Sequence, residues 1–336
     1  MYHRNSICML TQYAFSILFI DKKKAKFSND RFGLNRQPYK LNNLTDMSKF
    51  FPESELVINN DCSVFHLHIK PEQLADKVVL VGDQGRVGLV ASHFDSKECE
   101  ISNREFHSIT GTYKGKRVTA LSTGIGCDNI DIVLNELDAL ANIDFASRTE
   151  KPTHRALTLV RVGTCGGLQP NTPCGTYIAS VKSIGFDGLL NFYAGRDEAS
   201  DLKLEDAFKR HVGWNDKMGN PYVASADAEL LDRIAGDDMV RGITVACGGF
   251  FGPQGRQLRL PLMAPGLNEK IESFEYEGLR IDNFEMESSA LAGLSALMGH
   301  HAMTCCMVIA NRRAKKMETD YKGDIDGLIV RVLDRI

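Results

Sequence analysis

From Val78 onward, short apolar segments alternate with amphipathic stretches. The apolar segments are four to eight residues long and rich in β-branched side chains: Val78–Val81, Val118–Ser122, Leu157–Val162, Tyr177–Val181, Ile243–Cys247 and Met303–Ala310. Nearly continuous apolar runs of this length are typical of strands that are buried on both faces of a sheet. We therefore predict a strand at each of these positions.

Three stretches between the predicted strands have the spacing of helices. Asn129–Ala141 follows a candidate N-cap, Asp128,. Its apolar positions recur at helical intervals and would share one face: Ile130, Val133, Leu134, Leu137 and Ala141,. Met286–Met298 is rich in small residues and is followed by Gly299, and Ala226–Ala235 predicts a third helix,. Strands that alternate with helices indicate an α/β sheet with helices on both faces.

Two segments do not follow this alternation. Residues 185–222 are rich in Gly, Asp, Asn and Lys and have little periodicity, so we interpret them as an insertion. Ile7–Ile20 has the apolar character of a signal-peptide core, but a charged run follows it instead of a small-residue cleavage site,. We expect residues 1–46 to be a disordered extension outside the fold. Met47 would then be the working start of a domain that spans residues 47–336.

Composition excludes several classes of protein. The net charge is -3 and there is no dense basic stripe, which argues against nucleic acid as a partner,. No apolar run reaches the roughly 20 residues that span a bilayer, so no membrane partner is expected. The nine cysteines form no C-x-x-C pair and none has zinc-ligand spacing with histidine, so we predict no metal site,. Their odd number without a disulfide framework favours a reducing, cytoplasmic location.

Glycines and arginines cluster where predicted strands end. Gly82 and Arg86 follow the first strand, and Arg161 lies inside another, next to a glycine-rich segment that contains Thr164. Ligands of α/β sheets bind at the carboxyl ends of strands, glycine exposes the backbone to anions, and arginine matches phosphate. A buried arginine also requires a partner, so Arg161 has two interpretations: an ion pair with Asp83 or a glutamate, or an anion ligand. Together these residues favour an anion pocket, although their spacing fits no P-loop.

A second group of candidates lies in the C-terminal half. Phe250, Gln254 and Arg256 combine an aromatic face with hydrogen-bonding groups, which suits a planar base. The alternative is an aromatic loop that packs on the core. Glu287 stands where a helix is predicted to begin, and it either answers the helix dipole or accepts hydrogen bonds from the vicinal hydroxyls of a sugar,.

Seven segments, in this order, resemble the nucleoside phosphorylase-I family, and most closely its uridine phosphorylases: VFHLHI, VGDQGRV, SNREF, STGIG, RVGTCGGLQP, FFGPQGR and NFEMESSALAGL. The resemblance covers roughly Val64 to Arg312. It implies a single α/β domain with a central mixed β-sheet flanked by helices.

The resemblance also implies a role for each matching residue. These roles form three groups: phosphate contacts from Gly82, Arg86, Arg161, Thr164 and Arg104 of a neighbouring subunit; ribose contacts from Thr164, Met286, Glu287 and His66 of a neighbouring subunit; and base contacts from Phe250, Gln254 and Arg256. The catalytic set would be Arg86, Arg161, Glu287 and Arg256. Residues shared across an interface imply at least a dimer, and the family suggests a ring of three dimers.

The implied reaction is phosphorolysis in pyrimidine salvage: uridine and phosphate yield uracil and ribose 1-phosphate. Purine members of the family carry an aspartate that protonates the leaving base, and this chain has Asn311 there, which favours a pyrimidine. A purine phosphorylase, a nucleosidase and a non-enzymatic nucleoside- or phosphate-binding protein are the alternatives. The sequence leaves open the preference among uridine, deoxyuridine and thymidine.

No cofactor is expected, because inorganic phosphate is a co-substrate. Glu105 matches a residue that binds potassium at the dimer interface of some relatives. The partner serine of those relatives is Asn129 here, so no potassium site is assigned.

Overall fold

The computed structural model describes residues 49–317 and 322–336, so the predicted extension, residues 1–46, lies outside the described part of the chain. The strands are β1 (Lys77–Val81), β2 (Ser96–Asn103), β3 (Phe106–Tyr113), β4 (Lys116–Ser122), β5 (Ile143–Asp144), β6 (Thr149–Glu150), β7 (Thr158–Gly167), β8 (Tyr177–Gly185), β9 (Tyr222–Ser225), β10 (Val240–Ala246), β11 (Glu275–Tyr276), β12 (Leu279–Glu285), β13 (His301–Asn311) and β14 (Lys316–Met317). The helices are α1 (Gln84–Ala91), α2 (Cys127–Asn142), α3 (Arg196–Ala199), α4 (Leu202–Val212), α5 (Ala228–Ile234), α6 (Leu267–Glu272), α7 (Ser288–Met298) and α8 (Lys322–Arg335), with short 3-10 turns η1 (Pro71–Gln73), η2 (Leu189–Phe192) and η3 (Gly252–Gln254).

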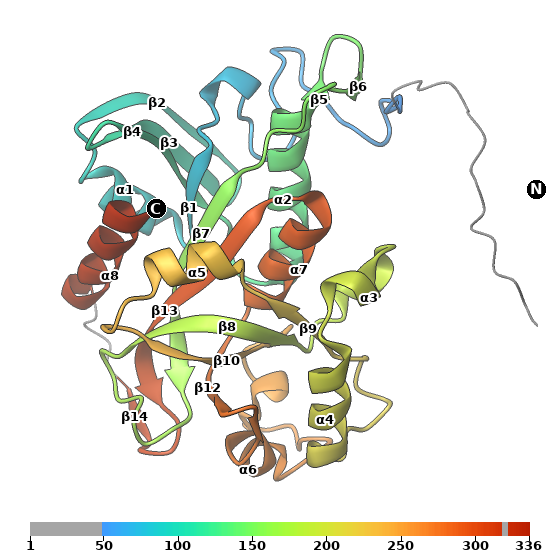
Figure 1. The fold of residues 1–336 in the computed structure, drawn as a ribbon, viewed down its shortest axis with the longest axis vertical. Helices are drawn as coiled ribbons and strands as arrows, with labels where there is room; N and C mark the ends of the chain where they lie inside the picture. The colour runs from blue at the N-terminus through green and yellow to red at the C-terminus, as the bar shows by residue number, and fades with distance from the viewer. Residues whose placement is uncertain (1–48, 318–321) are drawn as a thin grey trace, which may run out of the picture. The chain divides into compact units, whose positions relative to one another are not determined.

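Most of the strands join one mixed sheet, which confirms the predicted fold class (Figure 1). Within the described residues it has 12 strands, and its main path runs β11-β12-β10-β8-β13-β7-β1-β4-β3-β2. The neighbours β13, β7, β1 and β4 run parallel to one another, whereas β8 is antiparallel to β13. Because β12 also pairs with β7, the strands β7, β13, β8, β10 and β12 close into a ring.

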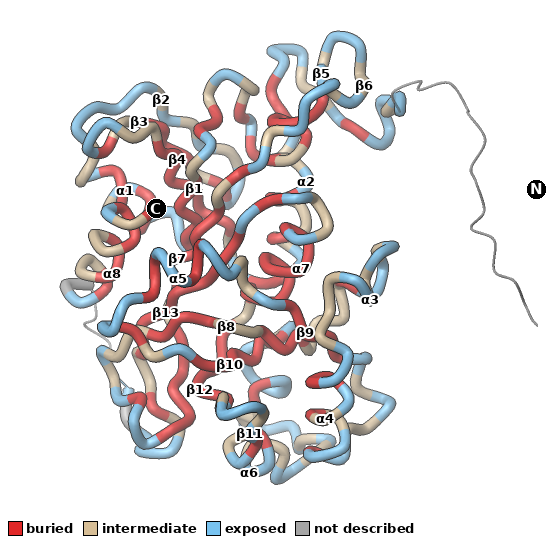
Figure 2. Tube along the Cα trace, viewed as in Figure 1, coloured by how far each residue is buried: buried red, intermediate tan, exposed pale blue. Residues whose placement is uncertain are grey.

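The core lies on both faces of the sheet, and helices cover each face (Figure 2). Strand β1 illustrates the arrangement, since Val78, Val79, Leu80 and Val81 all have an exposed fraction of 0%. Val79 and Val81 pack toward α1, α5 and α8, whereas Val78 and Leu80 pack toward α2 and α7. A strand with helices on both sides needs apolar residues at every position, which is the pattern that predicted it. No helix in the described ranges is long and apolar enough to cross a membrane.

Two predicted helix boundaries need correction. Helix α2 begins at Cys127, and Gly126, with φ of 103°, occupies the N-cap position, so the prediction that Asp128 caps the helix was wrong. Glycine is suited to this position because its φ lies in a region that side chains disfavour. Helix α7 begins at Ser288, which leaves Met286 and Glu287 in the segment that precedes the helix.

Residues 185–222 were interpreted as an insertion or long excursion in which periodicity fades, and the loss of periodicity was wrong for part of the segment. The segment contains η2, α3 and α4, and α4 is amphipathic. Its buried residues Leu204, Phe208 and Val212 recur every four positions, and they pack in the same core cluster as residues of β10 and β12. The Asp201 side chain accepts a hydrogen bond from the N–H of Leu204 at the start of the helix. The abundance of charged residues on the outer face obscured this spacing in the sequence.

Asp282 in β12 provides a prediction about stability. Its side chain packs against Gly242, it is 5% exposed, and among the described residues no donor hydrogen-bonds to its carboxylate. Burial therefore raises the pKa of Asp282 from 3.8 to about 6,. Between pH of about 4 and about 6 this carboxyl group holds its proton in the folded chain but loses it in the unfolded chain. The free energy of unfolding therefore falls as the pH rises through this range.

We expect Asp282→Asn to remove the loss of stability that comes from ionising a buried carboxyl group. The free energy of unfolding of the variant should exceed that of the unmodified chain by about 1–3 kcal/mol at pH 8. The difference should vanish near pH 4, where the carboxyl group is neutral. Urea denaturation of both proteins at the two pH values measures it, and an equal difference at both would contradict the assignment.

Candidate active site

A cavity of about 770 Å³ brings together nine of the eleven predicted site residues: Gly82, Arg86, Arg161, Thr164, Phe250, Gln254, Arg256, Met286 and Glu287. These residues come from the turn after β1, from the first turn of α1, from β7, from the loop after β10 and from the segment between β12 and α7. Segments far apart in the sequence therefore meet at one site. The other two predicted residues, His66 and Arg104, do not line this cavity.

The turn between β1 and α1 supplies an open backbone and a fixed arginine. Asp83 caps α1 by accepting the Arg86 N–H at 2.9 Å, and its carboxylate also pairs with the Arg86 guanidinium at 2.9 Å. Arg86 Nη1 donates to the carbonyl oxygen of Val162 in β7 at 3.3 Å. A Cβ atom at Gly82 would meet only the Gly124 carbonyl, at 3.9 Å, so the protein leaves space beside this backbone. Such a turn suits an oxyanion.

Arg161 lies within β7 and is 4% exposed. Its Nη2 donates to the carboxylate of Glu287, and its Nη1 lies 3.3 Å from Glu285. Of the two partners considered for an ion pair, the structure has the glutamates and not Asp83. Burial lowers the pKa of Arg161, but the two carboxylates outweigh burial and raise it above its ordinary value. Arg161 is therefore a permanent cation at the floor of the site.

Gly163 creates the space that this guanidinium occupies. A Cβ atom at this position would lie 2.1 Å from Arg161 Nη1 and 3.0 Å from the Sγ atom of Cys306. Any side chain at residue 163 would therefore displace the guanidinium. The sequence analysis did not assign this role, since the glycine-rich segment alone does not show which glycine faces Arg161.

Glu285 and Glu287 have different hydrogen-bond partners near the start of α7. Glu285 accepts the N–H groups of Glu287 and Ser288 at 2.9 and 3.0 Å, together with the Ser288 hydroxyl at 2.6 Å, so it is the carboxylate that caps the helix. The Glu287 carboxylate points away from the helix and accepts the Gly126 N–H at 2.7 Å. Burial raises the pKa of Glu287, against the opposing effect of Arg161. No role was predicted for Glu285, although its place two residues before Glu287 was a usable signal in the sequence.

The loop after β10 carries a cation above an aromatic ring. The Arg256 guanidinium lies 3.8 Å from the centre of the Phe250 ring and donates to the Phe250 carbonyl at 2.7 Å and to the side-chain oxygen of Gln254. Burial, with the nearby charge of Arg312, lowers the pKa of Arg256 to about 10, so it stays charged at neutral pH. Phe250 and Phe251 are 47% and 52% exposed, so they are not a loop packed on the core.

The end of β13 completes the cavity with residues that the sequence analysis did not assign. Arg312 donates to the carbonyl of Gln254 at 3.0 Å, and Lys315 also lines the wall. Asn311 uses its amide hydrogens on the carbonyls of Gln169 and Thr172, at 3.1 and 2.9 Å. In total, five cationic and three acidic side chains line the cavity, an excess of two positive charges. A dianion would neutralise this excess.

His66 and Arg104 lie elsewhere on the chain. His66 Nδ1 is 2.7 Å from the Glu136 carboxylate, at a separate cavity of about 930 Å³ beside α2. Arg104, in the turn between β2 and β3, lies over the Phe65 ring at 5.3 Å. Both positions agree with a role toward a neighbouring subunit, and that role stays a prediction.

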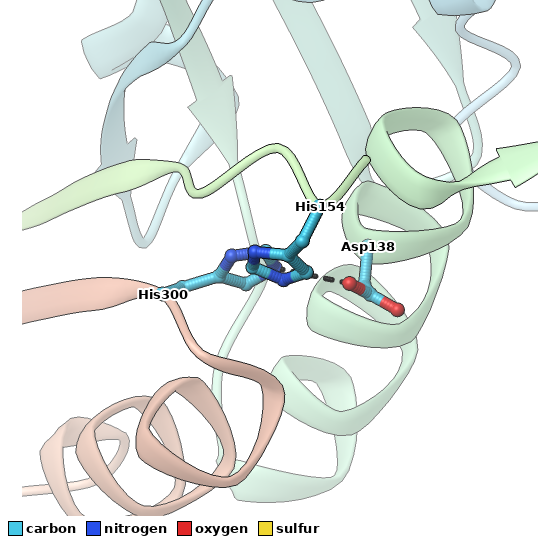
Figure 3. A group of neighbouring side chains, drawn as sticks. All are labelled: Asp138, His154 and His300. Carbon is cyan, nitrogen blue, oxygen red and sulfur yellow. Dashed lines mark ion pairs between the residues drawn. The ribbon is translucent and has the colours of Figure 1, made fainter. Parts of the chain in front are cut away.

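Asp138, His154 and His300 are the group that comes nearest to a metal site within the described residues (Figure 3). The nitrogen that His300 directs toward Asp138, Nε2, is 3.3 Å from its carboxylate. The other nitrogen, Nδ1, accepts the Leu157 N–H at 3.2 Å, so the neutral ring carries its proton on Nε2,. A protonated nitrogen cannot bind a metal, and none of the three residues lines the 770 Å³ cavity. We therefore treat the group as structural.

The Glu105 and Asn129 pair does not form an evident potassium site either. Asn129 directs its amide nitrogen toward the Ile125 carbonyl, at 3.5 Å. The same amide carries an oxygen as well, so this contact leaves the potassium site unassigned.

Comparison with known proteins agrees with this geometry. Residues 76–328 match the phosphorylase superfamily. The chain is 30% identical to a uridine phosphorylase from Thermococcus kodakarensis over 258 residues, 74% of this chain and 77% of that one. It is 31% identical to a DeoD-type purine nucleoside phosphorylase from Thermoanaerobacter sp. (strain X514) over 163 residues, 46% of this chain and 64% of that one.

A solved structure has the same fold over most of the chain. It is a nucleoside phosphorylase from Trypanosoma brucei described as showing uridine phosphorylase activity. The TM-score is 0.75 at 29% identity, and the match covers 84% of this chain and 100% of that chain.

Proposed function

The chain belongs to the phosphorylase superfamily, as a nucleoside phosphorylase, and we propose that its reaction is the phosphorolysis of a pyrimidine nucleoside. Uridine and inorganic phosphate would give uracil and ribose 1-phosphate. The observation that carries the proposal is a single cavity lined by Arg86, by the Arg161–Glu287 ion pair and by Gln254 with Arg256. Its excess of two positive charges equals the charge of the HPO₄²⁻ dianion.

The residues of the cavity suit each part of the reaction. A phosphate oxygen attacks C1′ of the ribose as the bond to the base breaks, through a transition state with oxocarbenium character. Gly82, Arg86 and Arg161 would hold the phosphate beside C1′, which supplies positioning and electrostatic stabilisation. Glu287 would accept hydrogen bonds from the ribose 2′- and 3′-hydroxyls.

The leaving base takes up the electrons of the broken bond. Arg256 and Gln254 would stabilise that negative charge by donating to the carbonyl oxygens of uracil, with the ring of Phe250 beside them. The Gln254 oxygen accepts the Arg256 guanidinium N–H, and this leaves the N–H groups of the same amide to donate to the base,. No covalent intermediate is required.

A purine nucleoside is the second candidate, because purine nucleoside phosphorylases are also among the relatives. A purine leaving group needs a proton at N7. Asn311 has no acidic proton to give, and its amide hydrogens are engaged by two backbone carbonyls. This arrangement favours uridine.

The choice between the two is tested with uridine and inosine, each supplied at the same concentration with saturating phosphate. We expect kcat/KM for uridine to exceed that for inosine by at least about 100-fold. This is the scale of the rate lost when no general acid protonates the leaving base. Release of uracil and hypoxanthine is followed chromatographically. Faster release of hypoxanthine would assign the chain to the purine class.

We further propose that His66 and Arg104 complete the site of a neighbouring subunit. Neither residue lines the 770 Å³ cavity of its own chain, which supports this proposal. The active form would then be at least a dimer, and sizing of the active enzyme in solution tests it.

A further inference from the structure

A largely buried, hydrogen-bonded polar cluster lies next to the segment that precedes α7. Its members are Asp187, which follows β8, Tyr222 at the start of β9 and Ser289 in the first turn of α7. Tyr222 and Ser289 are each 0% exposed. None of the three lines the 770 Å³ cavity, so the reaction described above does not use them directly.

The hydrogen bonds of this cluster converge on one carboxylate. The Tyr222 hydroxyl donates to Asp187 Oδ1 at 2.8 Å, and the Ser289 hydroxyl donates to Oδ2 at 2.9 Å. The backbone N–H of Leu189 adds a third donor to Oδ1 at 2.8 Å. Three donors therefore satisfy the hydrogen-bonding capacity of this carboxylate,.

Tyr222 is suited to be a permanent donor. Burial raises the pKa of its hydroxyl, and the negative charge of Asp187 raises it further. The hydroxyl consequently keeps its proton over the whole working range of pH. Its ring also fills the space beside Gly185, where a Cβ atom would lie 2.6 Å from the ring.

The cluster connects to the ribose segment through the first turn of α7. Ser289 lies two residues after Glu287, so a bond that fixes the Ser289 side chain restricts how the turn can move. Cys127 at the start of α2 contributes from the same side, since its thiol donates to the Met286 carbonyl at 3.1 Å and lies 3.7 Å from the Ser289 hydroxyl. Glu287 itself is held on its other side by Gly126 and Arg161.

We propose that Asp187, Tyr222 and Ser289 are positioning residues that set the place of Glu287 and so the recognition of the ribose hydroxyls. This inference rests on the proposed function, because it takes Glu287 as the ribose contact. A misplacement of about 1 Å at a reacting site can cost on the order of 100-fold in rate. Loss of one hydrogen bond in the cluster should have a smaller effect, seen in the binding of the ribose part of the substrate.

The test uses Tyr222→Phe, which keeps the ring, and Ser289→Ala, which removes one hydroxyl from a helix. A loss of about 1.4 kcal/mol of binding is a tenfold change. We expect each variant to raise KM for uridine about tenfold while KM for phosphate stays the same. The preference for uridine over 2′-deoxyuridine, taken as the ratio of kcat/KM values, should fall by a similar factor.

The matched control is Tyr113→Phe, since the Tyr113 hydroxyl donates to Asp334 at 2.6 Å and lies outside both this cluster and the two cavities. It should leave KM and the sugar preference unchanged. An unaltered preference in both Tyr222→Phe and Ser289→Ala, at full folding by circular dichroism, would overturn the inference. A wild-type enzyme that does not phosphorolyse uridine would instead overturn the proposed function. In that case uridine binding by calorimetry, compared with 2′-deoxyuridine, still tests the cluster, and equal loss of both in the variants would refute it.

Discussion

Replacement of Arg161 by methionine should reduce turnover of uridine by about 1,000-fold, the scale of losing one preorganised charge at a transition state. Methionine keeps much of the volume but provides no charge for phosphate. The same change should lower the free energy of unfolding by about 3–5 kcal/mol, because Glu285 and Glu287 are left buried without their cation,. Steady-state kinetics and urea denaturation measure the two effects.

Arg241→Met is the matched control for this variant. Arg241 pairs with Asp232 at 2.7 Å on the surface and is 42% exposed, so its loss should change stability by less than about 1 kcal/mol and leave turnover unaltered,. The destabilisation of Arg161→Met should also become smaller at acidic pH, where protonation removes the charge of Glu287, whose pKa burial raises,. A destabilisation that does not depend on pH, or an active Arg161→Met enzyme, would contradict the assigned role.

Gly163→Ala should reduce turnover by about 100-fold, although it adds a single methyl group. The methyl carbon would lie 2.1 Å from Arg161 Nη1, so the guanidinium must leave its place between the two glutamates. The loss should appear in kcat and in KM for phosphate. The same kinetic assays measure it, and a crystal structure of the variant would locate the displaced arginine.

Gly88→Ala provides the comparison. Gly88 lies in α1, and a Cβ atom there would meet nothing within 4 Å. Alanine should leave activity unchanged and stabilise the helix by up to about 1 kcal/mol. Equal activity of the two variants would show that Gly163 does not make room for the arginine.

The sequence predicted the central strands because their physical requirement is simple. Val78–Val81 is covered by helices on both faces, and such a strand must be apolar throughout. The amphipathic helix α4 was missed because its apolar positions, four residues apart, stand among many charged ones. Asp128 was mistaken for a cap because capping depends on backbone geometry, and Gly126 reaches a φ of 103° there.

The sequence predicted which residues gather at the site, but not all of the contacts between them. Residues that follow strands are brought together by the sheet, so Gly82, Arg86 and Thr164 could be grouped before the fold was known. The partners of Arg161 could not, because Glu285 and Glu287 come from a distant strand end that reaches β7 only when β12 closes the ring. The same holds for Asn311. The sequence shows an asparagine in place of an aspartate, but its two backbone contacts depend on the turn at Gln169–Thr172.

The measurement that tests the central proposal most directly is release of uracil from uridine with and without inorganic phosphate. Release of uracil should require phosphate, saturate with it and yield ribose 1-phosphate in equal amount. Release of uracil at the same rate without phosphate, with free ribose as the product, would contradict it and leave the positive excess of the cavity without its dianion.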